Sequence, residues 1–154
     1  MKTTKMINIS RRDAISLMLG TAGYLMSSKI AFAGKEQVLK RIDEITKGKG
    51  AKELDMFLDL PEIAENGNQV KVNFEIESEM INSNYIKNVY ILADGNPAPD
   101  VAKFSFTPDM GICSATTRIR LSKTQNVFLI AENNKKEFFM TKSKVKVTIG
   151  GCGG

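Results

Sequence analysis

The sequence predicts an all-β fold, an antiparallel β-sandwich of immunoglobulin-like type with about seven strands and a short N-terminal helix. Segments in which apolar and polar residues alternate recur from residue 70 onward, as in strands that are buried on one face. Two further segments, NVYILA and NVFLIAE, are almost wholly apolar, and the stretches ADGNPAPD, SKTQN and ENNKK between the segments are rich in turn-forming residues. These observations indicate one sandwich domain over residues 34–149.

Residues 1–33 have the features of an export signal. A basic start precedes a moderately apolar stretch and the small-x-small triplet AFA, so we expect cleavage before Gly34. The pair Arg11 and Arg12 resembles the twin-arginine signal of bacteria, and a Sec signal is the alternative. The apolar stretch is shorter than the roughly 20 residues that cross a membrane. We therefore expect export to the periplasm by the twin-arginine route, with no membrane anchor.

A short amphipathic helix is predicted over residues 35–47, at the start of the mature chain. Its apolar residues recur at helical spacing, and the glycines of the following GKGKGAK stretch end it and form a linker. The apolar residues are Val38, Leu39, Ile42 and Ile45.

The first strand alternates through Val70, Val72, Phe74 and Ile76, after the stretch DLPEIAENGNQ, which we interpret as a turn. The remaining predicted strands are NVYILA, VAKFSFT, CSATTRIRLS, NVFLIAE, EFFMT and KVKVTIG. The last two are predicted as separate strands, and KVKVTIG places Val145, Val147 and Ile149 on one face.

Charge argues against a nucleic-acid partner. The full chain carries 22 Lys and Arg against 17 Asp and Glu. Residues 1–33 hold five of these basic residues and one acidic residue, so the rest has 22 − 5 = 17 basic and 17 − 1 = 16 acidic residues. A chain this close to neutrality lacks the dense basic surface that phosphate backbones require.

The residue types also argue against a self-sufficient enzyme. The chain has no histidine, which removes the usual general base and the commonest metal ligand. Glu75, Glu77 and Glu79 could form a carboxylate pair, but their spacing places all three on the solvated face of one strand. We therefore predict no catalytic residue, no metal site and no cofactor of the protein's own.

Two cysteines remain as reactive groups. Cys113 has the strand parity of Ala115 and Ile119, so we expect it to point into the core. Cys152 follows the last strand within GGCGG, and the flanking Gly150, Gly151, Gly153 and Gly154 make a slender, flexible arm over residues 150–154. A thiol of ordinary pKa is mostly protonated at neutral pH, so we expect partner enzymes to activate Cys152. A structural disulfide between the two cysteines is the alternative.

The segments LDLPEIAENGNQV, ILADGNPAPDVAKFSFTP, TRIRLSKTQNVFLIAE and KVTIGGCGG, in this order, resemble the SoxY family of sulfur-oxidation carrier proteins. The resemblance implies that Cys152 holds sulfur intermediates of thiosulfate oxidation covalently. It implies a heterodimer with a SoxZ-like subunit, exported as a passenger. It also implies a c-type haem enzyme that conjugates thiosulfate, a hydrolase that releases sulfate and, in some organisms, a molybdenum enzyme that oxidises the remaining sulfane sulfur.

One cysteine departs from the family pattern. The family has a single cysteine at the tip, so Cys113 is additional here. The alternative function is a non-catalytic immunoglobulin-like binding module in which Cys113 and Cys152 form a structural disulfide.

Overall fold

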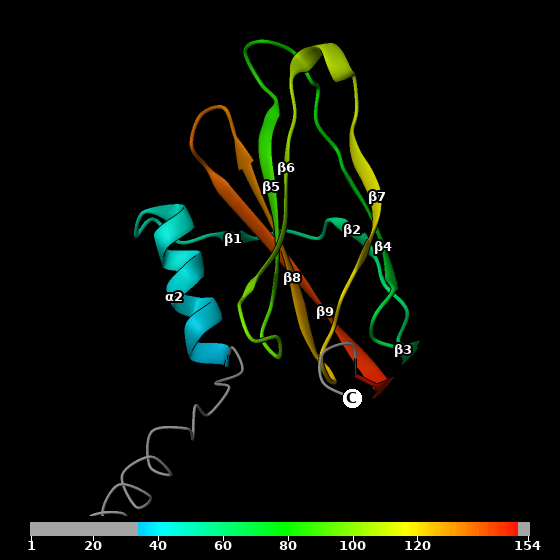
Figure 1. Ribbon diagram of the computed structural model, residues 1–154. Coiled ribbons are helices and arrows are strands. Elements are labelled where there is room, and N and C mark those ends of the chain that lie inside the picture. The colour runs from blue at the N-terminus through cyan, green and yellow to red at the C-terminus, as the bar shows by residue number, and fades with distance from the viewer. Residues whose placement is uncertain (1–33, 151–154) are drawn as a thin grey trace, which may run out of the picture. The chain divides into compact units, whose positions relative to one another are not determined.

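The computed structural model describes residues 34–150, which contain one α-helix, one short 3-10 helix and nine strands (Figure 1). In chain order these elements are α2 (Lys35–Thr46), β1 (Lys52–Glu53), β2 (Phe57–Asp59), β3 (Ile63–Asn66), β4 (Val70–Ile76), β5 (Ile86–Ala93), β6 (Asp100–Ser105), η1 (Pro108–Met110), β7 (Cys113–Ile119), β8 (Gln125–Asn133) and β9 (Phe138–Ile149). The predicted signal at 1–33 lies outside the described residues.

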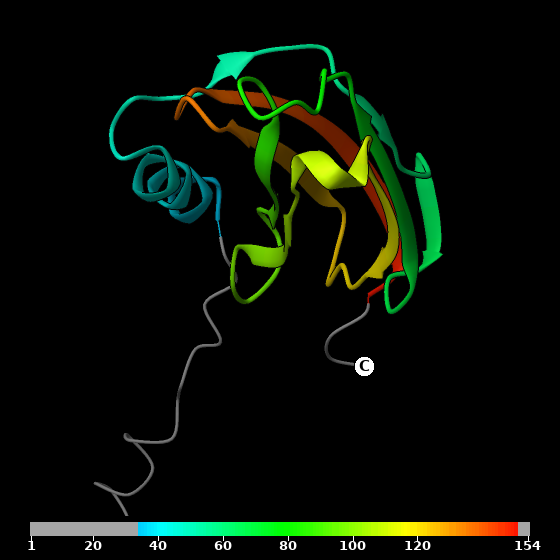
Figure 2. The ribbon, with the colours of Figure 1, turned by 90° about the horizontal axis from the view of Figure 1, so that it is seen from above.

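The strands form two sheets. The larger has the order β1-β9-β8-β5-β6, with β3 also paired to β9, and the smaller has the order β2-β4-β7. Most neighbours are antiparallel, whereas β1 and β3 run parallel to β9. Figure 2 shows the two sheets wrapped around one interior, with α2 outside. The predicted all-β, immunoglobulin-like sandwich with an N-terminal helix is confirmed, with more strands than expected because three short ones lie between α2 and β4.

The core follows from the alternation in the sequence. On β4, Val70, Val72, Phe74 and Ile76 are buried and the residues between them are more exposed. Phe74 packs edge-on against Phe104 at 5.3 Å and Phe106 at 6.3 Å between ring centroids, which joins β4 to β6 and to the chain that follows it.

The helix covers part of the outer face of the larger sheet. Val38 and Ile42 pack with a second apolar cluster of the sheet, which consists of Leu92, Phe128, Ile130 and Phe138. The helix ends at Thr46 because Lys47 adopts a left-handed conformation at φ 53°. Leu39, predicted on the apolar face, is 52% exposed because it lies at the margin of the buried stripe.

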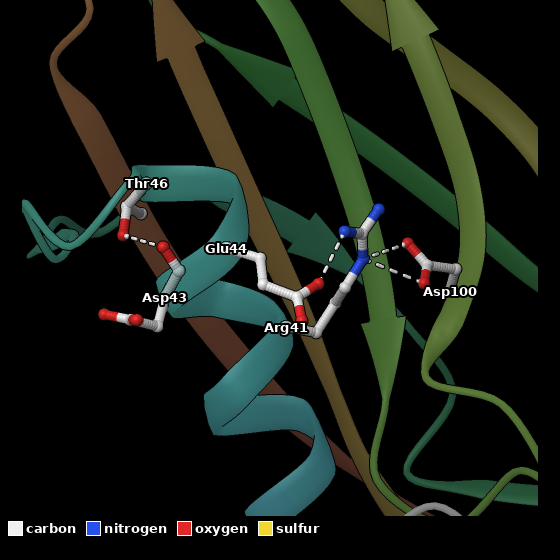
Figure 3. Close-up of polar contacts among 5 residues, drawn as sticks. All are labelled: Arg41, Asp43, Glu44, Thr46 and Asp100. Atoms are coloured by element: carbon white, nitrogen blue, oxygen red, sulfur yellow. Dashed lines mark hydrogen bonds and ion pairs between the residues drawn. The ribbon is translucent and has the colours of Figure 1, made fainter.

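A surface ion pair also links the helix to β6 (Figure 3). Arg41 donates from Nε to both carboxylate oxygens of Asp100 at 2.9 Å and from Nη1 to Glu44 at 3.0 Å. These hydrogen bonds, above all that to Asp100, raise the pKa of Arg41. Within the same helix, the Thr46 hydroxyl donates to the Asp43 carbonyl at 3.3 Å. Because the Arg41 pair is exposed, we assign it less than about 1 kcal/mol of stability.

Two strand predictions were wrong. EFFMT and KVKVTIG form one continuous strand, β9, because β8 pairs with it along its first part and β3 pairs with its second. The predicted turn DLPEIAENGNQ contains β3, whose ladder with β9 is extended by the Lys146 amide, which donates to the Glu62 carbonyl at 2.9 Å. Ile149, predicted to be on the buried face, is 68% exposed because β9 extends past β8 there.

No helix within residues 34–150 is long and apolar enough to cross a membrane.

Candidate functional site

The predicted site residues follow β9. Gly150 is described and comes directly after the strand, whereas Gly151, Cys152, Gly153 and Gly154 lie outside the described residues. The site can therefore be built from the residues that hold Ile149 and Gly150, which we call the β9 terminus. Figure 1 shows it at one end of the sandwich, next to β3.

Gly67 joins the β9 terminus to the chain that follows β7. Its amide donates to the carbonyl oxygen of Ile149 at 2.8 Å, and its own carbonyl oxygen accepts from the Leu121 amide at 2.8 Å. Gly67 is buried. One residue in the turn before β4 thus fixes the position at which the chain leaves β9.

Two hydroxyl groups hold β9 in place where it extends beyond β8. The Val147 amide donates to Thr124 Oγ1 at 3.0 Å. On the other side, Thr148 Oγ1 donates to the carbonyl oxygen of Glu65 at 2.9 Å. The first bond satisfies a β9 amide on the side that β8 no longer covers, and the second adds a side-chain contact to the pairing of β9 with β3.

Gly150 has a steric reason to be glycine. A Cβ built on its backbone would overlap the carbonyl oxygen of Ser122. The obstacle is main chain and not the end of a flexible side chain, so the overlap could be relieved only by moving the backbone. Ser122 therefore sets the path of the chain as it enters the GGCGG segment.

A buried polar network holds Ser122 in place. The side-chain oxygen of Asn96 accepts from the Ser122 amide at 3.0 Å, from its hydroxyl at 3.2 Å and from Gln125 Nε2 at 3.0 Å. Asn96 Nδ2 donates to the Arg120 carbonyl at 2.9 Å. Gln125 in turn accepts from the Gly95 amide at 2.6 Å. Each Asn96 and Gln125 group named here is satisfied, as buried polar groups must be.

A second pair of bonds ties the same loops together. The Asn126 amide and side chain donate to the two carboxylate oxygens of Asp94 at 2.8 and 2.7 Å. The motifs ADGNPAPD and SKTQN, interpreted from the sequence as turns only, thus support the β9 terminus through Asp94, Asn96, Gln125 and Asn126. Their place among the segments that resemble SoxY was the only sequence signal for this role.

Cys113 lies at the far end of β7 from this network. It is 2% exposed and a free thiol, and burial raises its pKa to about 12. The predicted inward orientation is confirmed. Because the neutral thiol is retained at ordinary pH, Cys113 behaves as a small apolar core residue.

Chain length also separates Cys113 from Cys152. Cys113 and Ile119 are at the two ends of β7, six residues or about 20 Å apart. Leu121, two residues after Ile119, is the residue that binds Gly67 at the β9 terminus. Cys152 is two residues past Gly150, a reach of about 7 Å. A disulfide requires Cα atoms within about 7 Å, so the position of Cys113 at the far end of β7 argues against this bridge.

The predicted carboxylate candidates are not brought into a site. Glu75, Glu77 and Glu79 are all exposed, and Glu79 accepts a hydrogen bond from Asn84 at 3.1 Å. Over residues 34–150 there is no group of three or more acidic or cysteine side chains that could hold a metal ion.

Comparison with solved structures gives two kinds of match. The sulfur carrier protein SoxY from Chlorobium limicola f thiosulfatophilum is 25% identical with a TM-score of 0.62, covering 73% of this chain and 92% of that chain. A superoxide reductase (neelaredoxin) from Ignicoccus hospitalis is 15% identical with a TM-score of 0.55, covering 61% of this chain and 80% of that chain. The second match shows a shared fold alone. Comparison with curated protein sequences gives no match.

A family model described as sulfur oxidation protein SoxY matches residues 42–152. The match begins in α2, includes the loops that hold the β9 terminus and ends at Cys152. The chain belongs to the SoxY family of sulfur oxidation proteins.

Proposed function

We propose that this protein is a periplasmic carrier that holds sulfur intermediates of thiosulfate oxidation on Cys152 and presents them to partner enzymes. The observation that carries the proposal is the family match that continues through the sandwich to Cys152. The solved SoxY structure, described as a sulfur carrier protein, supports it. The course of β9 supports it too, since this strand brings the chain to Gly150 at the end of the domain.

The chemistry requires a thiol and an external oxidant. In loading, the Cys152 thiol and thiosulfate form a sulfur–sulfur bond. The thiol proton is released and two electrons pass to the c-type haem enzyme. In the next step, water attacks the terminal sulfone group in the hydrolase, which releases sulfate and two protons and leaves a persulfide anion on Cys152. A molybdenum enzyme, where present, oxidises that remaining sulfur.

Each of these steps occurs in the active site of a partner enzyme, and the carrier extends its thiol into that site. Two glycines before Cys152 span about 7 Å without side chains, so the thiol can enter a narrow active site. A covalent link keeps the intermediate at high local concentration and away from other thiols. Gly151, Gly153 and Gly154 serve as the slender part of the arm, and Gly150 joins it to the domain.

Export and assembly complete the proposal. Residues 1–33 direct the chain through the twin-arginine route, which transports folded proteins and so allows a SoxZ-like subunit to leave with it. The alternative, a binding module with a structural disulfide, is disfavoured by the burial of Cys113 and its distance from the β9 terminus.

The test is Cys152→Ser in the complete thiosulfate-oxidising system. We expect turnover to be abolished and the thermal unfolding midpoint to be unchanged. Cys113→Ala is the matched control and should retain turnover. Thiosulfate oxidation that persists with Cys152→Ser would overturn the proposal.

A further inference from the structure

We infer that basic side chains beside the β9 terminus form a docking surface for an acidic protein surface, the rim of the active site that receives Cys152. The inference deepens the proposed function and rests on it. The surface is the basic patch, which we define as Lys71 and Arg118 on the outer face of the smaller sheet and the exposed Arg120 just after β7.

Strand register brings two like charges together in this patch. Lys71 on β4 lies directly opposite Arg118 on β7, and both side chains are exposed. Like charges directly opposite each other on a sheet oppose folding. The fold therefore tolerates a repulsion here that an acidic partner would relieve.

Nothing within residues 34–150 neutralises the patch by an ion pair. The ion pairs of this part of the chain are Arg41 with Glu44 and with Asp100, and Lys52 with Glu137. The next row of the smaller sheet is neutral across β4 and β7, where Thr116 donates to Asn73 at 2.9 Å.

The carboxylate of the neighbouring strand β2 does not form an ion pair with the patch. Asp59 on β2 pairs in register with Asn73, diagonal to Lys71, and forms no ion pair with it. Glu75 is further along β4, away from the β9 terminus. The patch thus keeps a net positive charge at the end of the sheet.

The patch is continuous with the β9 terminus. Arg120 immediately precedes Leu121, which binds Gly67, and its carbonyl is held by Asn96. On the other sheet, Lys144 and Lys146 are exposed on the outer face of β9, four to six residues before Gly150. An enzyme that takes in Cys152 approaches this end and meets basic side chains on both sheets, while the exposed carboxylates at this edge are Glu62 and Glu65 beside β9.

The positive charge of the patch is a local feature, because the chain after residue 33 as a whole is nearly neutral, with 17 basic and 16 acidic residues. Glu75, Glu77 and Glu79 are at the opposite end of the smaller sheet. A small basic surface on a nearly neutral domain suits steering of a protein encounter, since complementary charge raises the association rate.

The experiment measures the rate at which the c-type haem enzyme loads Cys152 with thiosulfate. It uses the full exported protein with its SoxZ-like subunit, at about 50 and 200 mM salt, a range over which screening of exposed charges changes markedly. The variant is the triple substitution Lys71→Gln, Arg118→Gln and Arg120→Gln. We expect kcat/KM at low salt to fall about tenfold through KM, with kcat unchanged and the salt dependence reduced.

The matched control is Lys135→Gln with Lys136→Gln. These exposed lysines are in the turn before β9, at the opposite end of that strand, and the double variant should load like the wild type. Alkylation of Cys152 by neutral iodoacetamide should be equal in all three proteins. The triple variant should unfold at a temperature no lower than that of the wild type, because the Lys71–Arg118 repulsion is removed. The loading rate of the single variant Arg118→Gln provides a second measurement of the same effect.

Equal loading of the triple variant and the wild type would overturn the docking surface. Loss of the heterodimer in the triple variant would also overturn it, because the patch would then bind the SoxZ-like subunit. The same holds if the triple variant loses binding to anionic vesicles or duplex DNA while its loading rate is unchanged. A change in adduct lifetime alone would assign the patch to the anionic cargo instead. Failure of the wild type to be loaded at all would contradict the proposed function, so the two failures are distinguishable.

Discussion

The backbone of Gly150 lies against the carbonyl oxygen of Ser122, so closely that a Cβ on residue 150 would overlap that oxygen. Ser122 is in turn fixed by two hydrogen bonds, from its amide and its hydroxyl to the side-chain oxygen of Asn96, which also accepts a hydrogen bond from Gln125. The first glycine of GGCGG is therefore part of the domain's packing. The position of Gly150, where the chain leaves β9, depends on a polar network that is remote from it in sequence.

Gly150→Ala should loosen the β9 terminus. The new methyl group forces the Ser122 backbone or the end of β9 to move, which weakens the bonds of Gly67 to Ile149 and Leu121. We expect the amides of Gly67 and Leu121 to exchange with solvent at least about fivefold faster. Gly34→Ala is the control, because a Cβ at Gly34 meets nothing within 4 Å. Unchanged exchange at both amides would show that Ser122 does not constrain residue 150.

Asn96→Ala should destabilise the domain more than loss of an exposed hydrogen bond does. It leaves buried donors of Ser122 and Gln125 without their acceptor, which costs about 2 kcal/mol of unfolding free energy. Thr116→Ala removes an exposed bond to Asn73 and should change that free energy by less than about 0.5 kcal/mol. Urea unfolding measures both. Similar losses in the two variants would mean that the network has no special structural role.

Cys113 should make stability pH-dependent above pH 9. Its pKa is raised by burial from 9.0 to about 12, so the unfolded chain ionises first as the pH rises. The contribution of the neutral Cys113 thiol to the unfolding free energy is fully present below about pH 9. It is lost between about pH 9 and about pH 12, at about 1.4 kcal/mol per pH unit. Cys113→Ala removes this loss, and the other groups titrate equally in both proteins. The difference in unfolding free energy between wild type and variant should therefore shrink with pH; a constant difference would contradict the buried neutral thiol.

The helix should depend on Val38 and not on Leu39. Val38 is fully buried against the larger sheet, so Val38→Ala should lower the unfolding free energy by about 2 kcal/mol. Leu39→Ala removes a larger side chain that is 52% exposed, and we expect less than about 0.5 kcal/mol. Thermal or urea unfolding tests the pair. Equal losses would mean that both residues belong to the apolar stripe that the sequence suggests.

The sequence predicted features that local periodicity determines. Alternation on β4 identified Val72 and Phe74 as core residues, and strand parity placed Cys113 inside. Spacing also predicted the helix to within one residue, because apolar side chains and following glycines mark its limits.

Contacts between segments that are far apart in the sequence could not be predicted from local periodicity. β3 is a strand because β9 lies beside it, and nothing in its own Asn- and Gly-rich surroundings distinguishes it from a turn. Asn96 and Gln125 are polar residues in turn-like stretches, so their burial follows only from the meeting of loops that are about 30 residues apart. The Lys71–Arg118 pair likewise appears only with the β4–β7 register.

The central claim, that Cys152 carries the sulfur, is tested most directly by intact-mass measurement after incubation with thiosulfate and the partner enzymes. We predict one thiosulfate-derived adduct that maps to the peptide containing Cys152, disappears on reduction, persists in Cys113→Ala and is absent from Cys152→Ser. An adduct on any other residue, or no adduct in the presence of active partner enzymes, would contradict the claim.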